Sequence, residues 1–364
     1  MKRTLHGLVR TALLLAPLLL LPTAARAQTF HVLHRYDIGG DAGFFDYLNV
    51  DPATNRVYVT RSTHVMVVDG SSGKVVGNIP NTPGVHGVAF APRHGRGFIT
   101  ASGDSTVTMF DMQSLKVLDR IQTHTPGLDG IAYDDATDRI FTMDHSHDPG
   151  SSVAIDAATG KVVGKVMLDG APEGAAADGQ GKLFINIEDK SEIQVVDTKA
   201  LKVIATWSLA PGEGPTGLAL DRDTHRLFSA CHSGQMIVMD ATSGKVVAQI
   251  PIGPGPDAIG WDPSRKLIYT PGGGSFGRVG GAQAETGGTI TVAHEDSPDK
   301  YTVVATVNTM RGARTIAVDD TRHVAYTFTP EYGPAPANAQ QESGRRGRFR
   351  RGPVKASWLF VVGK

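Results

Sequence analysis

A repeat with a period of about 43 residues limits the folds that this sequence can adopt. In five segments a run rich in β-branched residues ends at an Asp, and a Lys stands five positions later: VVDGSSGKVVG, MFDMQSLKVLD, AIDAATGKVVG, VVDTKALKVIA and VMDATSGKVVA. The shared Asp positions, at steps of 42, 45, 41 and 43 residues, are Asp69, Asp111, Asp156, Asp197 and Asp240. Such a period indicates a repeat architecture, in which each unit buries its apolar face against its neighbours.

A second motif, typified by VDPATNRVYVT, precedes each of these segments. Its basic positions are Arg56, Arg96, Arg139, Lys182, Arg226 and Lys266. Each unit contains four short runs of strand-forming residues separated by Gly, Pro, Asp and Asn, without a sustained helical period. Four antiparallel strands every ~40 to 45 residues are typical of a β-propeller blade. Counting the second motif, including a weaker copy near the C-terminus, predicts seven blades.

The two ends of the chain complement each other. The last unit has three strand-like runs, RTIAVDD, HVAYTFT and SWLFVVG, whereas FHVLHRYDIGG near the N-terminus resembles the fourth strands of the other units. We predict that the N-terminal strand completes the last blade and closes the ring, which protects the strand edges. The predicted domain covers 28–364, with mobile insertions rich in Gly, Pro, Gln and Ser at 271–288 and 330–356.

The first residues have the pattern of a secretory signal peptide. Residues 1–27 contain a basic head, an apolar run over 12–21 and Ala25-Arg26-Ala27 at the exit. We therefore expect cleavage after Ala27 and a periplasmic or secreted protein. The remaining chain has 32 basic and 36 acidic residues, because this segment holds four basic residues and no acid. That balance argues against a surface built throughout for nucleic acid, and no later run approaches the ~20 apolar residues of a membrane span.

The repeats also carry a family resemblance. RVYVT and VVDGSSGKVV resemble the repeats of the YncE-like, or YVTN-repeat, family of exported seven-bladed propellers, and the resemblance covers essentially the whole mature chain. It implies an all-β fold of four-stranded antiparallel blades. We expect Arg56, Asp69 and their counterparts to stabilise turns or contacts between blades. A propeller fold alone does not name a function.

One face of the predicted propeller carries residues that differ from blade to blade. The approaches to the first strands align as GFFDYLN, GVHGVAF, GLDGIAY, APEGAAA, GPTGLAL, GPDAIGW and GARTIAV. Their variable residues are Asp46, His86, Asp129, Glu173, Thr216, Asp257 and Arg314. Blade symmetry predicts that these residues form a ring at the channel mouth, and convergent polar groups in a concavity are the default ligand-site hypothesis. A solvated channel rim is the alternative.

Histidines are expected on the same face, in the connections between second and third strands. The stretch MDHSHDPGSS places His145 and His147 two positions apart, and His232 lies in the corresponding connection of blade 5. With the ring carboxylates these histidines can bind zinc, copper or calcium. We expect them at larger radius, as a secondary shell around the ring; a polar turn is the alternative. Cys231 is the only cysteine, which excludes an intramolecular disulfide and c-type haem attachment.

The insertion at 330–356 carries a cluster of arginines around Phe349: Arg345, Arg346, Arg348, Arg350 and Arg351. Cations beside an aromatic residue suit a phosphate backbone, another anionic polymer or an acidic partner. A solubilising loop is the alternative.

Three functions follow from these features. The sequence favours a scaffold that binds a small molecule or a protein partner at the propeller mouth. The second hypothesis is a metal-assisted hydrolase of the lactonase type, because some propellers resembling this one carry lactonase sites at the mouth. A ring carboxylate or His86 would then act as general base, and Arg314 would stabilise developing negative charge. The third hypothesis is binding of an anionic polymer or nucleic acid through the loop at 345–355.

Overall fold

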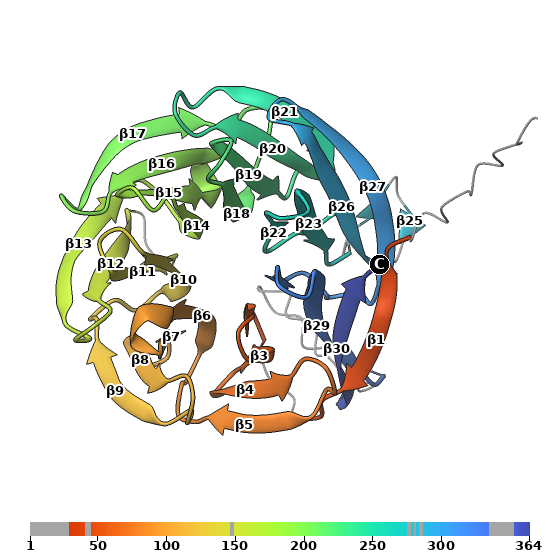
Figure 1. The fold of residues 1–364 in the computed structure, drawn as a ribbon, viewed down its shortest axis with the longest axis horizontal. Coiled ribbons are helices and arrows are strands. Elements are labelled where there is room, and N and C mark those ends of the chain that lie inside the picture. Colours follow the sequence, from red (N-terminus) through yellow and green to blue (C-terminus); the bar gives the residue numbers. More distant parts are fainter. Residues whose placement is uncertain are drawn as a thin grey trace, which may run out of the picture.

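The chain folds into a seven-bladed β-propeller. The structure, a computed structural model, describes residues 29–40, 45–145, 149–274, 278–279, 282–283, 287–334 and 353–364. Within these ranges, seven four-stranded antiparallel sheets are arranged in a ring, with one additional two-stranded hairpin (Figure 1). The seven blades that the sequence predicts are confirmed.

The first three blades follow one another along the chain. Blade 1 consists of β2 (Leu48–Asp51), β3 (Arg56–Arg61), β4 (His64–Asp69) and β5 (Val75–Ile79). Blade 2 consists of β6 (Val85–Ala91), β7 (Arg96–Ala101), β8 (Thr106–Asp111) and β9 (Val117–Gln122), with the 3-10 turn η1 (Pro92–His94) between β6 and β7. Blade 3 consists of β10 (Leu128–Asp134), β11 (Arg139–Asp144), β12 (Gly150–Asp156) and β13 (Val162–Leu168).

The next three blades repeat this order. Blade 4 consists of β14 (Pro172–Ala177), β15 (Lys182–Ile187), β16 (Glu192–Asp197) and β17 (Lys202–Ser208), with the 3-10 turn η2 (Glu188–Lys190) before β16. Blade 5 consists of β18 (Pro215–Asp221), β19 (Arg226–Cys231), β20 (Gln235–Asp240) and β21 (Val246–Pro251). Blade 6 consists of β22 (Gly260–Asp262), β23 (Leu267–Gly272), β26 (Gly288–Ser297) and β27 (Lys300–Thr309), and the hairpin β24 (Arg278–Val279) and β25 (Ala282–Gln283) follows β23.

Blade 7 joins the two ends of the chain. It consists of β28 (Ile316–Asp319), β29 (Val324–Tyr332), β30 (Val354–Gly363) and β1 (His31–Asp37). The N-terminal strand β1 pairs antiparallel with the C-terminal strand β30, and the two lie side by side in red and blue in Figure 1. The predicted closure of the ring by the N-terminal strand is therefore confirmed.

The insertions are shorter than the sequence suggests. Strand β29 extends to Tyr332 and β30 begins at Val354, because Pro330 pairs with Ser357 and Tyr332 pairs with Val354. In blade 6, β23 and β26 pair up to the positions Gly272 and Thr289. Strand structure thus continues by three residues into each end of the predicted insertion 330–356, and by two residues and one residue into the ends of 271–288.

The repeated polar residues have structural roles, as expected. Asp69 Oδ1 accepts hydrogen bonds from the backbone N–H groups of Ser71 and Ser72, and these bonds help to hold the pKa of Asp69 below its usual value. Arg56 Nη1 donates to the carbonyls of Met112 and Gln113 in blade 2. Counterparts of Arg56 reach the following blade in the same way, with Arg139 donating to the carbonyl of Thr198. The Asp repeat therefore stabilises turns, and the Arg repeat connects neighbouring blades.

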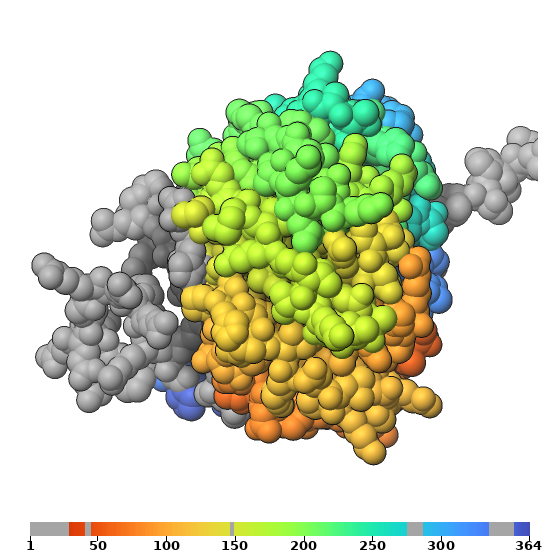
Figure 2. Space-filling view, turned by 90° about the vertical axis from the view of Figure 1, so that its left-hand side faces the viewer, coloured from red at the N-terminus to blue at the C-terminus, as the bar shows by residue number. Residues whose placement is uncertain are grey.

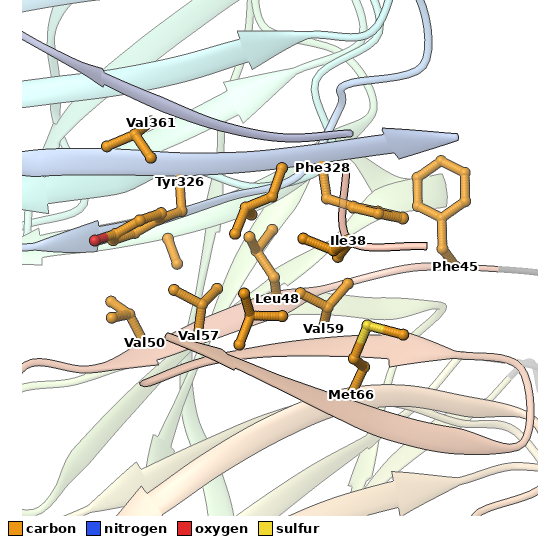
Figure 3. Close-up of a cluster of buried hydrophobic side chains, with 13 residues drawn as sticks. Ile38, Phe45, Leu48, Val50, Val57, Val59, Met66, Tyr326, Phe328 and Val361 are labelled. Carbon is orange, nitrogen blue, oxygen red and sulfur yellow. The ribbon is translucent and has the colours of Figure 1, made fainter. Parts of the chain in front are cut away.

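Hydrophobic side chains pack within each blade and between neighbours. Each of the seven second strands carries a fully buried aromatic residue, namely Tyr58, Phe98, Phe141, Phe184, Phe228, Tyr269 and Tyr326. At the boundary of blades 1 and 7, Ile38 from the segment after β1 packs with Phe45, Leu48 and Phe328 (Figure 3). The outer strands are less protected, and those of blades 3 and 4 form the side of the propeller seen in Figure 2, where Met167 is 56% exposed.

Glycine allows the first strands to come into direct contact around the channel. A Cβ at Gly174 would lie 2.4 Å from the carbonyl oxygen of Thr216, and a Cβ at Gly217 would lie 2.3 Å from the carbonyl carbon of Ala258. Both contacts are with the backbone of the next blade. A side chain at either position would push neighbouring blades apart.

A buried carboxyl pair lies between blades 5 and 6, where the end of β18 meets β26. Thr224 Oγ1 donates to Asp221 Oδ2 at 2.7 Å and lies 3.0 Å from Glu295 Oε1. Glu295 is fully buried, and burial together with its hydrogen bond to Asp221 raises its pKa. A raised pKa in the folded state means that the stability contributed by protonated Glu295 is lost as the pH rises through that pKa.

We expect Glu295→Gln to remove this pH dependence. At pH 8 the variant should exceed the wild type in free energy of unfolding by about 1–2 kcal/mol, because an amide avoids the buried negative charge. The difference should shrink as the pH falls to 5. Urea unfolding between pH 5 and 8 measures it, with Asp223→Asn as the control, since Asp223 is an exposed carboxylate of the same turn. A pH-independent difference would show that the carboxyl pair is not the cause.

No helix in the described ranges is long and apolar enough to cross a membrane.

Candidate functional site

The candidate site lies at the channel mouth, on loops fixed by hydroxyl groups of the second strands. Thr60 Oγ1 accepts a hydrogen bond from Asp46 N at 3.0 Å and donates to the carbonyl of Tyr47 at 2.8 Å. In blade 2, Thr100 Oγ1 donates to the carbonyl of Asp129 in blade 3 at 2.6 Å. These bonds fix the backbone that carries the ring residues, so the side chains have defined directions.

One half of the ring is a chain of ion pairs around His86. His86 Nδ1 lies 2.6 Å from Asp46 Oδ2 and 3.4 Å from Asp129 Oδ1. The other oxygen of Asp46 faces Arg314 Nη2 at 3.4 Å, and Arg314 Nη1 lies 3.1 Å from Asp257 Oδ2. Five segments, one from each of blades 1, 2, 3, 6 and 7, are thereby joined through alternating charges.

The other half of the ring centres on Glu173 and His145. His145 Nδ1 lies 3.0 Å from Glu173 Oε1, and His145 Nε2 lies 3.5 Å from Glu188 Oε2. The second oxygen of Glu188 lies 3.3 Å from His232 Nδ1. Tyr47 OH reaches from blade 1 to donate to Glu173 Oε2 at 2.7 Å.

Burial strengthens these interactions. Asp46, Glu173 and Asp257 are 5%, 7% and 9% exposed. Burial raises the pKa of Asp46 and that of Asp257 to about 7, and it raises the pKa of Glu173 as well. The neighbouring Asp129 adds to all three increases, because like charges disfavour ionisation. The buried carboxyls therefore hold protons more readily than exposed ones.

Neighbouring carboxylates favour the cationic form of the site histidines. Burial lowers the pKa of His86, but Asp129 and Asp46 outweigh this effect and raise the pKa to about 10. The carboxyl group of Glu173 raises the pKa of His145 to about 9, and Glu188 raises the pKa of His232. Together with Arg314, these imidazolium groups offset the carboxylates of the mouth.

Most of the predicted ring comes together, with one exception. Asp46, His86, Asp129, Glu173, Asp257 and Arg314 form the network described above. Thr216 does not join it, because the residue is 1% exposed and its hydroxyl donates to the carbonyls of Ala230 and Pro256 between blades 5 and 6.

The predicted histidine set is only partly described. His145 lies in direct contact with the ring residue Glu173. Its backbone N–H donates to the carbonyl of Gly127, which holds the start of the β11–β12 connection near the mouth. His232 contacts Glu188 rather than His145. His147 lies outside the described residues, and so do the predicted anion-binding residues Arg345, Arg346, Arg348, Arg350 and Arg351.

Sequence reasoning missed the role of Tyr47. It counted Glu188 among the polar residues of the connections between second and third strands, but did not name it as a ligand. A signal for Tyr47 is present, because the residue after the ring position is Gly, Gly, Gly, Gly, Ala and Thr in the other six blades. An isolated aromatic residue among small ones at the channel indicates a role besides blade packing. Glu188 lies on η2, whose position beside His145 and His232 depends on the tertiary fold.

A cavity of about 680 Å³ adjoins the ring between blades 6 and 7. Phe45, Met310 and Tyr332 contribute apolar wall, and backbone of Gly273 and Gly312 also lines it. Its charged lining residues are His232, Asp257, Arg311, Arg314 and Glu331. Because Asp257 and Arg314 belong to both, the ring and the cavity form one continuous site.

Below the ring, the central channel is narrow. The cavity there is about 200 Å³ and is lined by first-strand residues of all seven blades, among them Tyr47, Gly87 and Gly217. The hydrogen bond from Tyr47 to Glu173 crosses from blade 1 to blade 4 at this level. The larger space for a ligand is therefore the cavity that adjoins the ring.

Two groups of side chains have the spacing of metal ligands. Asp46, His86 and Asp129 form one, and Asp129, His145 and Glu173 form the other; within each group the ligand atoms lie within 4.8 Å of one another. Both groups belong to the ring and share Asp129.

The comparisons with known proteins agree with the fold. The family model described as cytochrome D1 heme domain matches residues 53–308, which is most of the chain. The chain belongs to this family. The cytochrome D1 heme domain match begins in the first turn of blade 1 and ends in β27, so it covers blades 1 to 6.

The chain is also similar to protein YncE of three bacteria. It is 32% identical over 108 residues to YncE of Salmonella typhi, Salmonella typhimurium (strain LT2) and Escherichia coli (strain K12). These matches cover 26% of this chain, and the chain spans about 30% of the length of the curated relatives it matches. With the family match and the seven blades, they confirm the resemblance to YncE-like propellers.

Solved propellers resemble the structure in fold alone. A chain of the mitotic checkpoint complex has a TM-score of 0.68 at 16% identity, over 89% of this chain and 96% of that chain. The structure of U3-55K has a TM-score of 0.68 at 10% identity, over 90% and 98%. The WD40 repeats of RRP9 have a TM-score of 0.69 at 10% identity, over 90% and 97%.

The family description implies a haem, and neither the centre of the described ring nor the channel below it fits one. A haem is a flat macrocycle with an apolar body and carboxylates at its edge. The centre of this mouth is instead occupied by Asp46, Glu173 and Asp257, which are at least nine-tenths buried and would repel those carboxylates. The channel below is about 200 Å³ and is crossed by Tyr47, so it leaves no slot for a macrocycle. We derive no chemistry through haem for this chain.

Proposed function

We propose that this protein is an exported binding propeller whose mouth holds a small organic anion with an apolar body. The observation that carries the proposal is the cavity of about 680 Å³ that adjoins the ring, because concave sites with a few convergent polar groups are typical of ligand binding. Export rests on the signal-peptide pattern of residues 1–27, which lie outside the described residues.

The charges of the cavity favour an anion. Arg311, Arg314 and His232 contribute positive charge to its wall, against the carboxyls of Asp257 and Glu331. Glu331 Oε2 is already engaged, since Trp358 Nε1 donates to it at 2.8 Å. Burial raises the pKa of Asp257 to about 7, so this carboxyl carries only part of its charge at neutral pH.

The geometry of Arg314 suits a carboxylate. Its side chain is 38% exposed, although both terminal nitrogens have a ring partner. A guanidinium has five N–H donors, so it can hold Asp46 and Asp257 and still donate to a ligand. Phe45, Met310 and Tyr332 offer contact to the apolar part of such a ligand.

The lactonase-type alternative requires a metal ion at the mouth, where two groups of side chains have the spacing of metal ligands. The anionic-polymer alternative depends on residues 345–355, most of which lie outside the described ranges, and nothing in the described residues favours it over the mouth.

The test uses 3-phenylpropionate as a probe of the proposed ligand class, with its neutral amide and its amine analogue for comparison. We expect the carboxylate to bind the wild type, the amide to bind at least about tenfold more weakly and the amine not to bind, because the probes share one apolar body. Arg314→Met should weaken carboxylate binding about tenfold or more, since a charge-assisted hydrogen bond contributes ~1.5–3 kcal/mol. Isothermal titration in the presence of EDTA measures these affinities.

Arg322→Met is the matched control. Arg322 is 39% exposed and pairs with the buried Asp319 in a turn between first and second strands, so its loss perturbs the fold in a comparable way. It should leave probe binding unchanged. Equal affinities for the three probes, or equal losses in the two arginine variants, would contradict an anion site at the mouth.

A further inference from the structure

We propose that Asp129, His145 and Glu173 form a binding site for a divalent transition-metal ion at the centre of the mouth. The three residues come from the first strand of blade 3, the connection after β11 and the first strand of blade 4. Their ligand atoms lie within 4.8 Å of one another, and His145 Nδ1 is 3.0 Å from Glu173 Oε1. Zinc binds such nitrogen and oxygen ligands at ~2.0–2.2 Å, so small side-chain rotations suffice to bring all three to one ion.

Two of the proposed ligand atoms have no hydrogen-bond partner within the described residues. Asp129 Oδ1 and His145 Nδ1 are buried, and neither is in hydrogen-bonding geometry with any group in the described part of the chain. Each lies within ion-pair distance of one neighbour, His86 and Glu173 respectively. Buried polar atoms without a good partner are costly, and a shared cation would satisfy both atoms.

The groups behind the ligands match the outer shell of metal sites. His145 Nε2 faces Glu188 Oε2 at 3.5 Å, which is the carboxylate–histidine arrangement that orients a metal-binding imidazole. Tyr47 OH donates to Glu173 Oε2 and leaves Oε1 turned towards His145. We assign Glu188 and Tyr47 as positioning residues for this site.

The other group with ligand spacing, Asp46, His86 and Asp129, suits a metal ion less well. His86 Nδ1 and Asp46 Oδ2 are only 2.6 Å apart and already form a complete charge-assisted hydrogen bond. This pair fixes the position of Asp129 from one side. The ion is therefore placed on the His145 side of Asp129.

Three protein ligands leave coordination positions open. In zinc sites, an open position holds water or substrate, whereas a fourth protein ligand closes structural sites. An ion of this kind beside an anion-binding cavity is the arrangement that a metal-assisted hydrolase needs, since the ion lowers the pKa of bound water. The inference goes beyond the proposed anion binding and does not depend on it.

Zinc binding by the full-length protein tests the site. After removal of metal with a chelator and dialysis, equilibrium dialysis with zinc chloride should give one ion per wild-type chain. His145→Ala and Glu173→Gln should weaken binding about 100-fold or more, and Glu188→Gln about 10- to 100-fold. Cobalt in place of zinc should give visible absorption bands whose intensity falls in His145→Ala, which reports loss of the imidazole ligand directly.

His232→Ala is the matched control, because His232 faces the same Glu188 from outside the proposed ligand set. It should keep one zinc ion per chain at near wild-type affinity. The inference is overturned if the wild type takes up no stoichiometric zinc, if His145→Ala binds as tightly as the wild type, or if His232→Ala loses binding to the same extent. Circular dichroism of each variant checks folding, and the His145 and His232 pair decides the question even where Glu173→Gln does not fold. The EDTA titrations with 3-phenylpropionate are unaffected by either result.

Discussion

Deleting residues 29–38 is expected to lower the melting temperature by roughly 10 °C or more, or to prevent folding. The deletion removes β1 and leaves β30 as an unpaired edge, with six residue pairs lost between His31↔Gly363 and Asp37↔Trp358. It also removes Phe30 and Ile38, which are 9% and 5% exposed, and burial of each is worth ~1.5–3 kcal/mol. At ~1–2 °C per kcal/mol for a domain of this size, these losses account for about half of the expected shift, and the lost strand pairing with β30 adds the rest.

Replacing residues 275–286 with a short Gly-Ser linker is the control. This segment follows β23 and precedes β26 without including the paired ends of either strand, so the melting temperature should change by only a few degrees. A synthetic peptide of residues 29–40 should restore part of the stability of the deletion variant, because it can pair with the exposed edge of β30. Equal melting of the two variants would contradict closure of the ring by β1.

Gly217→Ala is expected to cost about 2–3 kcal/mol of stability, although it adds a single methyl group. The new Cβ would lie 2.3 Å from the carbonyl carbon of Ala258 and 2.5 Å from Ile259 N. Both atoms belong to the backbone that approaches the first strand of blade 6, so relief of the clash requires movement of a whole blade. Chemical unfolding of the purified variant gives the difference directly.

Gly287→Ala provides the comparison for a glycine without such a contact. Gly287 is exposed, and its added Cβ would lie 3.7 Å from the carbonyl oxygen of Thr309, which is ordinary van der Waals contact. Its stability should stay within ~0.5 kcal/mol of the wild type. If both substitutions lower the free energy of unfolding by the same amount, the direct contact between first strands is not the reason for glycine at position 217.

The fold could be predicted from the sequence because its determinants are local. Asp69 and its counterparts mark turns through hydrogen bonds to residues two and three positions away, and this pattern survives in each repeat. The missing fourth strand of the last unit indicated the closure. The extension of β29 to Tyr332 could not be predicted from local sequence, because it depends on pairing with Val354 across an insertion.

The candidate site was predictable to the extent that blade symmetry applies. Symmetry places one residue per blade at the mouth, which located Asp46, Glu173 and Arg314. It does not fix side-chain direction, and so it failed to indicate that the hydroxyl of Thr216 bonds between blades. The reach of His145 to Glu173 depends on a connection that no repeat constrains.

The most direct test of an anion site at the mouth is a crystal structure of the protein grown with 3-(4-bromophenyl)propionate in the presence of EDTA. We predict an anomalous bromine peak in the cavity between blades 6 and 7, near Phe45 and Met310. The probe's carboxylate should lie ~2.7–2.9 Å from a guanidinium nitrogen of Arg314, the distance of a charge-assisted hydrogen bond. A cavity without bromine density, or a probe bound there with its carboxylate directed away from Arg314 and Arg311, would contradict the proposed function.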